Sequence, residues 1–227
     1  MCGRYYIAAE DNDEEIARII AILNKEPEAA AQVHRGEIFP SQMAPVIVNT
    51  PGGWTVKAMK WGFPRAGGGG LVINSRCEKA DVTPMFSRAV RERRCLVPMS
   101  GFFEWRRTPS GGKTKDKFAF SLADGKAMFL AGVYGSFGGG AQAGGYDGFA
   151  ILTQDADEQM QPYHHRMPVI LDSREVRHTW LFAPPQSPYG DLRSLFHTPR
   201  LEVHRAGSVQ LIHPLDPKRG KRVDNTK

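Results

Sequence analysis

Two spacings of apolar residues run through this chain and predict two kinds of element. Ile16, Ile19, Ile20 and Leu23 recur at the spacing of one helical face, directly after the polar stretch 11–15. Carboxylates at the start of a helix cap its free amide groups and favour its dipole, so this stretch predicts the first turn. We therefore expect an amphipathic surface helix here, with its acidic residues in solvent.

The other apolar stretches are short and bounded by glycine, proline or asparagine, which is typical of strands. The expected strands are residues 2–7, 46–48, 54–59, 71–73, 95–98, 101–107, 118–122, 127–134 and 149–153, with hairpins around 50–53 and 123–126. Helices are expected to begin near Thr83, Ser173 and Gly190, and loops are expected at 40–45, 67–70 and 138–145. Many short strands with few helices predict an α+β fold.

The length and composition are those of one globular domain. The chain has 227 residues, of which 41% are hydrophobic, and a core of that size is easily assembled. We place the domain at residues 1–217 and interpret the basic segment 218–227 as a tail. Because the sequence shows neither a long apolar run nor a charged-then-apolar leader, we expect a cytoplasmic protein without a membrane span.

Positive charge is concentrated in one part of the chain. The net charge is +6, yet residues 1–50 hold four Lys or Arg against eight Asp or Glu, whereas residues 51–110 hold eleven against four. A basic cluster of this kind is either a solvated surface or a site for a polyanion. Aromatic residues among the charges favour the second interpretation.

The second residue carries the most unusual chemistry. If Met1 is removed, Cys2 becomes the N-terminus and holds an α-amine and a thiol on adjacent carbons. Such an aminothiol condenses with an aldehyde, first to an imine and then, when the thiolate closes the ring, to a durable thiazolidine. The other interpretation is an ordinary cysteine at a loose terminus. Cys77 and Cys95 are expected to be inert core thiols, and the cysteine spacing predicts no metal site or disulfide framework.

Two more polar residues stand in segments that could hold a site. Glu104 is flanked by aromatic residues, and burial there would raise its pKa and make it a general acid or base, whereas an exposed strand glutamate would be structural. His164 and His165 are adjacent, so on a strand they would point to opposite faces and would not bind one metal. His164 is either a structural histidine or a proton-transfer group.

Four separated segments, taken together, resemble one known family. They are Met1-Cys2-Gly3-Arg4, Asn74-Ser75-Arg76-Cys77-Glu78, Gly101-Phe102-Phe103-Glu104-Trp105 and His164-His165-Arg166-Met167-Pro168. Their order and character are similar to the CGR start, N-[AS]-R-x-E, G-[FW]-[FY]-E-W and H-x-R-x-P segments of the SRAP family (SOS response-associated peptidase domains, abasic-site processing proteins). Trp61-Gly62 resembles the family's W-G element, but the tryptophan-containing loop that often follows is replaced here by four glycines.

The resemblance implies a single domain with an open, barrel-like, mainly antiparallel β core and peripheral helices. Family members capture abasic sites of single-stranded DNA as a DNA–protein crosslink in the DNA damage (SOS) response, and no cofactor is implied. By matching position, Cys2 would be the nucleophile and Asn74 would hold the N-terminal residue. Glu104 would shuttle protons, and His164 would assist proton transfer at the sugar oxygen.

The resemblance also implies how DNA is held. Arg4, Arg76 and Arg166 would contact phosphates as charge-assisted donors, and Trp61 and Trp105 would offer apolar faces to unstacked bases. The expected partner is single-stranded DNA with abasic sites, bound by a monomer that is nucleoid-associated when on DNA. The family is also assigned peptidase, hydrolase and lyase-type activity. Removal of Met1 could be such an autopeptidase step, although a separate aminopeptidase would suffice.

Two alternatives from other functional classes stay open at this point. An N-terminal-nucleophile glutamine amidohydrolase also begins Met-Cys-Gly and uses the α-amine as the base for the thiol; glutaminase activity would identify it. A non-catalytic single-stranded DNA binder would rely on the basic segment alone. Such a binder would keep all of its activity in a Cys2→Ala variant.

Overall fold

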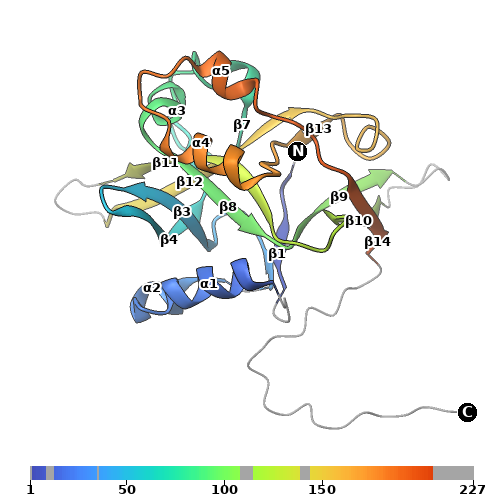
Figure 1. The fold of residues 1–227 in the computed structure, drawn as a ribbon, viewed down its shortest axis with the longest axis horizontal. Helices are drawn as coiled ribbons and strands as arrows, with labels where there is room; N and C mark the ends of the chain where they lie inside the picture. Colours follow the sequence, from blue (N-terminus) through green and yellow to red (C-terminus); the bar gives the residue numbers. More distant parts are fainter. Residues whose placement is uncertain (1, 9–12, 35, 108–114, 139–143, 207–227) are drawn as a thin grey trace, which may run out of the picture.

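The computed structural model describes residues 2–8, 13–34, 36–107, 115–138 and 144–206. Its helices are α1 (Glu14–Leu23), α2 (Pro27–Gln32), α3 (Ser87–Glu92), α4 (Arg174–Phe182) and α5 (Tyr189–Arg193), with a 3-10 turn η1 (Cys77–Lys79). Its strands are β1 (Tyr5–Ile7), β2 (Gly36–Ile38), β3 (Met43–Thr50), β4 (Gly53–Trp61), β5 (Phe63–Pro64), β6 (Leu71–Val72), β7 (Asn74–Arg76), β8 (Arg94–Met99), β9 (Gly101–Arg107), β10 (Lys115–Leu122), β11 (Met128–Phe137), β12 (Tyr146–Asp155), β13 (Arg166–Pro168) and β14 (Leu201–Arg205) (Figure 1).

Five strands close on themselves and form the centre of the molecule. The hydrogen-bonded order β11-β8-β3-β4-β12 is completed by pairing of β12 with β11, so this ring has no free edge. All of its pairs are antiparallel except β12 with β4. β12 also pairs with β13 and, in parallel, with β7. The predicted α+β class with a barrel-like, mainly antiparallel core is confirmed.

The first described strand, β1, is an inner strand of a second sheet. Its order is β14-β10-β9-β1-β2, so β1 lies between two partners. Tyr5 of β1 pairs with Ile38 of β2 on one side and with Phe102 of β9 on the other. Since all three residues are buried, pairing and burial together fix the position of the residues that precede β1.

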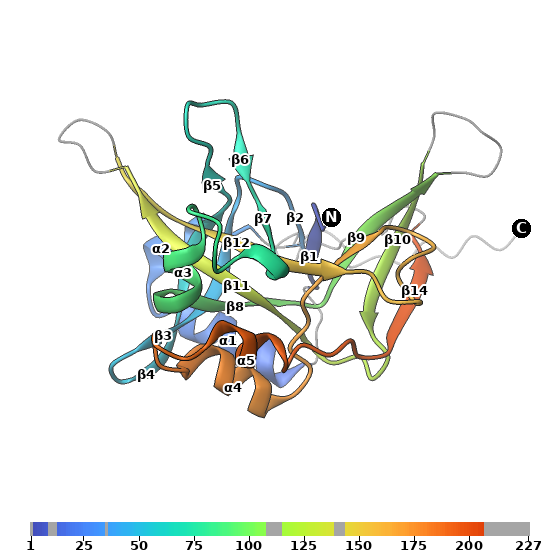
Figure 2. The same cartoon turned by 90° about the horizontal axis from the view of Figure 1, so that it is seen from above.

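The helices lie at the periphery, as expected. Asp13 caps α1 by accepting hydrogen bonds from the amides of Glu15 and Ile16, and Ile16, Ile19 and Leu23 form its buried face. Figure 2 shows α1, α4 and α5 on one side of the central strands, whereas the β5–β6 hairpin and the described ends of β9 and β10 extend to the other side. The start of the described chain lies between those two projections.

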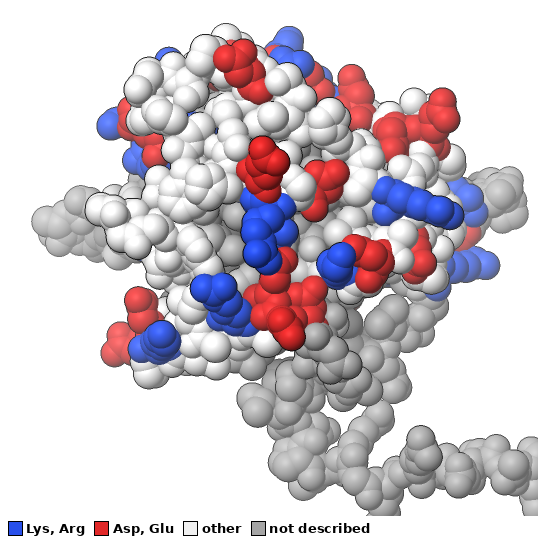
Figure 3. All heavy atoms as spheres, in the orientation of Figure 1, with Lys and Arg blue, Asp and Glu red and all other residues white. Residues whose placement is uncertain are grey.

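The helix side carries both charges without a dominant sign. On the face that Figure 3 shows, which has α1 and α4 toward the viewer, acidic and basic side chains are interspersed. Glu15 of α1 there pairs with Arg174 and Arg177 of α4. This face therefore offers no continuous basic surface. Among the described residues, none of the helices has the length and apolar character needed to span a membrane.

Several predicted elements were wrong in detail. The strands flanking 123–126 do not form a hairpin, since β10 pairs with β9 and β14 whereas β11 pairs with β8 and β12. Residues 43–45 belong to β3 rather than to a loop, and the helix expected near Thr83 begins at Ser87 after a turn. The predicted tail 218–227 and part of the predicted loop 138–145 lie outside the described residues.

Candidate active site around Cys2

Cys2 is fully buried and held by a side chain of β7, which pairs with the central barrel. The Asn74 Nδ2 donates a hydrogen bond of 2.9 Å to the Cys2 carbonyl oxygen, and the Cys2 Sγ points to the Arg4 carbonyl at 3.8 Å. Asn74 begins β7, which pairs in parallel with β12, whereas Cys2 precedes β1 of the second sheet. This hydrogen bond therefore links the two sheets at the position of the predicted nucleophile.

Burial controls the protonation of the Cys2 thiol. Removal from water raises the pKa of this thiol to about 12, and the nearby Glu104 carboxylate adds to the increase because a second negative charge there is unfavourable. A thiol with such a pKa is almost entirely protonated at neutral pH. Any reaction of the sulfur therefore needs a group that accepts its proton.

Glu104 is the acidic group next to this thiol. It lies on β9 with 4% of its surface exposed, so of the two interpretations the structure supports the buried glutamate. Side chains alternate along a strand, and Phe102 stacks on Phe120 in the core with ring centroids 5.0 Å apart. Glu104, two residues further on, projects from the same face, whereas Trp105 projects from the other.

His164 lies near Glu104, on the segment that connects β12 to β13. Burial lowers the pKa of His164, although the Glu104 carboxylate acts in the opposite direction, so neutral imidazole is favoured. Its Nδ1 lies 2.9 Å from the Arg166 amide nitrogen and 3.2 Å from the Arg166 carbonyl oxygen. When Nδ1 accepts from the amide, the neutral ring carries its proton on Nε2. The ring stacks on that of His165 with centroids 4.4 Å apart.

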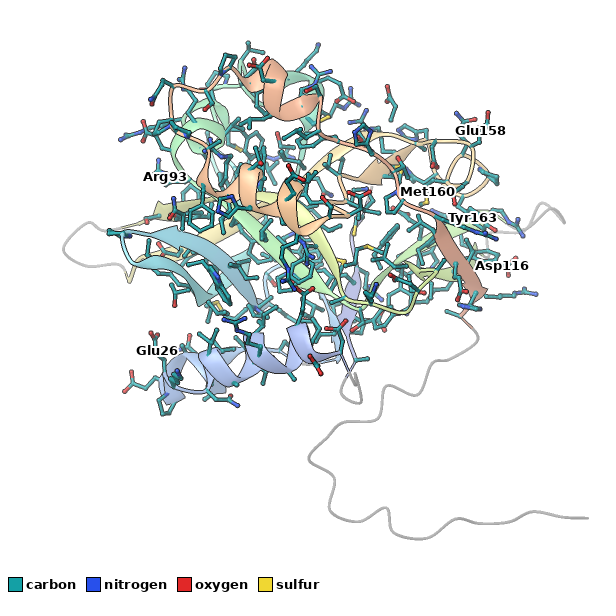
Figure 4. The ribbon with its side chains drawn as sticks, in the orientation of Figure 1. Glu26, Arg93, Asp116, Glu158, Met160 and Tyr163 are labelled. Carbon is teal, nitrogen blue, oxygen red and sulfur yellow. The ribbon has the colours of Figure 1, made fainter. Side chains whose placement is uncertain are left out.

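The connecting segment is anchored on the second sheet. The ring of Tyr163 packs edge-on against Phe118 and Phe120 of β10, with centroids 4.7 and 5.1 Å away. In Figure 4, Met160 and Tyr163 lie on the side of the molecule that carries β14. Because Tyr163 directly precedes His164, this aromatic contact holds the histidine over the inner face of the second sheet.

Trp61 does not offer a face to DNA, so that prediction was wrong. Its side chain is fully buried, with its ring 5.0 Å from that of Tyr5 and stacked on Phe149. Its Nε1 donates to the carbonyl of Ile73, the residue before Asn74. Trp61 therefore supports both segments of the site from inside the core.

Arg166 is not available for phosphates either, which corrects a second prediction. Its guanidinium binds both carboxylate oxygens of Glu78 at 2.8 Å, a carboxylate oxygen of Asp155 and the carbonyl of Thr153. Only 5% of its side chain is exposed. Through the hydrogen bonds of Nη1 and Nη2, Arg166 connects β13 to β12 and η1.

The other predicted DNA contacts stay accessible. Arg76 is exposed at the end of β7, and Arg4 and Trp105 are half-buried. The guanidinium carbon of Arg4 lies 5.2 Å from the centroid of the Trp105 ring. The structure thus brings Cys2, Asn74, Glu104 and His164 together. It keeps Arg4, Arg76 and Trp105 at the surface, whereas Trp61 and Arg166 are buried.

Sequence reasoning missed the residues that support this site. Tyr5 lies against Trp61 with its hydroxyl buried and without a hydrogen-bond partner among the described residues, and Glu37 and Lys117 bind each other near Arg4. The pairings that bring these strands together were not recognisable from local patterns. Within the described part of the chain, no group of three or more His, Cys, Asp or Glu residues could hold a metal ion.

This arrangement defines a β-rich protein whose second residue, a cysteine, is held beside a buried carboxylate and a neutral histidine. The chain belongs to the family described as SOS response associated peptidase (SRAP), whose pattern matches residues 1–209. The match agrees with the resemblance of the four segments. It favours this family over the glutamine amidohydrolase that the sequence left open.

Relatives and solved structures extend the match. The chain is 31% identical over 158 residues to the Bacillus subtilis abasic site processing protein YoaM, covering 66% of this chain and 67% of the relative. It is 30% identical over 190 residues to the B. subtilis abasic site processing protein YoqW, covering 80% of both chains. A Bacteroides thetaiotaomicron crystal structure has a TM-score of 0.70 at 20% identity, over 90% of this chain and 91% of that one. A Bordetella bronchiseptica crystal structure has a TM-score of 0.68 at 22% identity, over 90% of this chain and 99% of that one. These structures support the fold alone.

Proposed function

We propose that this protein captures abasic sites of single-stranded DNA covalently through Cys2, once Met1 has been removed. The observation that carries the proposal is the Asn74 hydrogen bond to the Cys2 carbonyl, because it fixes the terminal residue beside Glu104 and His164. Membership of the SRAP family and relatives named abasic site processing proteins support the same activity.

The proposed reaction joins an aminothiol to an aldehyde with loss of one water. The Cys2 α-amine attacks C1 of the ring-opened sugar, and loss of the aldehyde oxygen as water gives an imine. The Cys2 sulfur then adds to the imine carbon, a C–S bond forms, and the thiol proton is transferred to the nitrogen. The product is a thiazolidine, and no electrons are gained or lost.

Each buried polar group has a role in this sequence. Since the thiol is protonated at neutral pH, the amine reacts first and Glu104 accepts the thiol proton before passing it to the nitrogen. His164, with its proton on Nε2, donates to the departing sugar oxygen. The Asn74 Oδ1 is buried and has no hydrogen-bond partner among the described residues, so it is free to accept from the released α-amine.

DNA would approach from the side opposite the helices. Arg4 and Arg76 would bind phosphates, and Trp105 would stack on an unpaired base, which requires a single strand. We expect the protein to act as a monomer and without a cofactor.

The test is mass spectrometry of Met1-processed protein mixed with an abasic oligonucleotide. An adduct on the N-terminal peptide is expected, with the mass of the two components less one water. Cys2→Ser should still form an imine that borohydride traps, yet little stable adduct. No adduct on the N-terminal peptide would exclude the proposal, and an equally stable Cys2→Ser adduct would exclude ring closure by sulfur.

Removal of Met1 is a separate step, which the same site could catalyse. If Glu104 and Cys2 catalyse it, Glu104→Gln purified from a host lacking methionine aminopeptidase should keep Met1, whereas wild-type protein from that host should lose it. Intact mass distinguishes the two forms. Loss of Met1 from neither protein would assign the step to the aminopeptidase.

A further inference from the structure

One carboxylate oxygen near Cys2 binds two cations. The Oε1 of Glu37 accepts from the Arg4 Nη1 at 3.1 Å and from the Lys117 Nζ at 2.7 Å. The exposed fractions are 30% for the Arg4 side chain, 24% for Lys117 and 18% for Glu37, so the cluster is partly removed from water. Charges in such positions interact more strongly than fully exposed ones.

Glu37 lies on β2, Lys117 on β10 and Arg4 directly before β1, and all three are on one face of the second sheet. Lys117 pairs with Trp105, and Glu37 pairs with Tyr6. Arg4 lies opposite Phe103, whose amide donates to the Arg4 carbonyl. Residues directly opposite each other on paired strands project to the same side. This face therefore has the cations beside aromatic rings. Glu104 lies on the opposite face of the same sheet.

Aromatic rings hold both cations in place. The Arg4 guanidinium lies 3.9 Å from the centroid of Phe39 and 5.2 Å from that of Trp105. The Lys117 Nζ lies 3.7 Å from the centroid of Phe103 and 5.7 Å from Trp105. Phe39 is 37% exposed, which is unusual for a large apolar side chain in this protein. Cations fixed among partly exposed rings form the type of surface that binds single strands.

The donors of Arg4 are not all used. Its side chain is 30% exposed and binds Glu37 through Nη1, whereas its Nε is buried without a hydrogen-bond partner among the described residues. A phosphate would therefore bind the outer nitrogens, where Glu37 now binds. A guanidinium can present two parallel donors to a phosphate, as it does to a carboxylate. The Glu37 oxygen thus occupies the kind of position, between two cations, that a phosphate oxygen would take.

We propose that Arg4 and Lys117 form a subsite for a phosphodiester group of single-stranded DNA, and that the Glu37 carboxylate is an internal competitor for it. This inference rests on the proposed function, since it names how a strand captured at Cys2 continues past Arg4 onto the opposite face of the second sheet. Glu37 lowers the net charge of the cluster from two to one, so it weakens binding of any strand. Lesions are then selected by the covalent step rather than by affinity for the backbone.

The experiment is an anisotropy titration of full-length protein with an undamaged, fluorescein-labelled oligodeoxythymidine at several salt concentrations. Glu37→Gln should bind about three- to tenfold more tightly than wild type, and the log–log salt slope should become steeper by about 0.7, the value for one more neutralised phosphate on a single strand. Lys117→Gln should bind more weakly, with a slope shallower by about the same amount.

The matched control is Glu28→Gln, which removes the same charge from an exposed position on α2. It should leave affinity within twofold of wild type. Equal or weaker binding by Glu37→Gln than by this control would overturn the proposal, because Glu37 would then only hold the cations in place. So would an absence of binding by both wild type and Glu37→Gln at low salt. The oligonucleotide carries no aldehyde, so these results are independent of the mass-spectrometric test of covalent capture.

Discussion

At the scale of single residues, the proposed nucleophile lies in surroundings that suppress its reactivity. The Cys2 thiol is buried, and its pKa of about 12 keeps it protonated at neutral pH. Cys77 and Cys95 are buried free thiols as well, and burial raises the pKa of Cys77 to about 11. Cys77 also has a carboxylate nearby, that of Glu78, but Arg166 binds both of its oxygens. The carboxylate next to Cys2 is that of Glu104, so we expect the sulfur to become reactive only when Glu104 takes its proton.

Alkylation measures this suppression directly. At pH 7.5 the Cys2 peptide of native protein should react with iodoacetamide about 10³-fold more slowly than the same peptide in urea, because a free thiol has a pKa near 8.5. The native rate should keep rising about tenfold per pH unit between pH 8 and 10. A native rate that levels off near pH 8.5 would show that the thiol is not suppressed. Peptide mapping assigns the label among the three cysteines.

Proton transfer by Glu104 predicts a large kinetic effect with little change in binding. Glu104→Gln keeps the shape of the side chain but cannot exchange a proton, so single-turnover crosslinking should slow by about 10²–10⁴-fold. Affinity for an undamaged strand should stay within about twofold, and Glu28→Gln serves as the control. A crosslinking rate within threefold of wild type would make Glu104 a structural residue.

At the scale of elements, a local sequence pattern predicted helix α1, whereas pairings between distant segments were missed or predicted wrongly. Helix α1 was predictable because its cap, first-turn acids and buried face all lie within one short stretch. Strand β2 was missed because three residues are too few for a pattern, and β10 and β11 were paired wrongly because adjacency in sequence favoured a hairpin. The candidate residues of β7 and β9 were recognisable through motifs, whereas burial of Trp61 and Arg166 depends on partners far along the chain.

The ion pairs of Arg166 predict a stability effect rather than a DNA-binding effect. Arg166→Leu leaves the Glu78 carboxylate, 32% exposed, without its bidentate partner, and should cost about 2–3 kcal/mol, somewhat less than for a fully buried pair. Thermal unfolding should occur roughly 5–10 °C lower for a chain of this size. Below that temperature, affinity for undamaged single strands should equal that of wild type. A loss of affinity for single strands without a loss of thermal stability would show that Arg166 does contact DNA.

At the scale of the whole molecule, the net charge of +6 overstates the charge available to DNA. The helix side shows both signs interspersed, and Arg166 and Arg94 are buried and bonded within the fold. Arg4 and Arg76 each follow a site residue by two positions, Lys117 shares the Glu37 carboxylate with Arg4, and Glu37 offsets one of these three charges. In the proposed complex, about two effective positive charges would therefore contact the strand that reaches Cys2.

Salt dependence distinguishes this local surface from a general attraction to a basic protein. Each phosphate neutralised on a single strand contributes about −0.7 to the log–log slope of affinity against salt, so two effective cations predict a slope of about −1.4. Binding governed by most of the net charge would instead give a slope steeper than about −3.5. Titration of an undamaged oligodeoxythymidine between low and physiological salt measures the slope, and Arg76→Gln should make it shallower by about 0.7. A salt slope steeper than about −3.5 that does not change in Arg76→Gln would mean that charges outside the site govern binding. The electrostatic argument for placing the strand beside Cys2 would then be wrong.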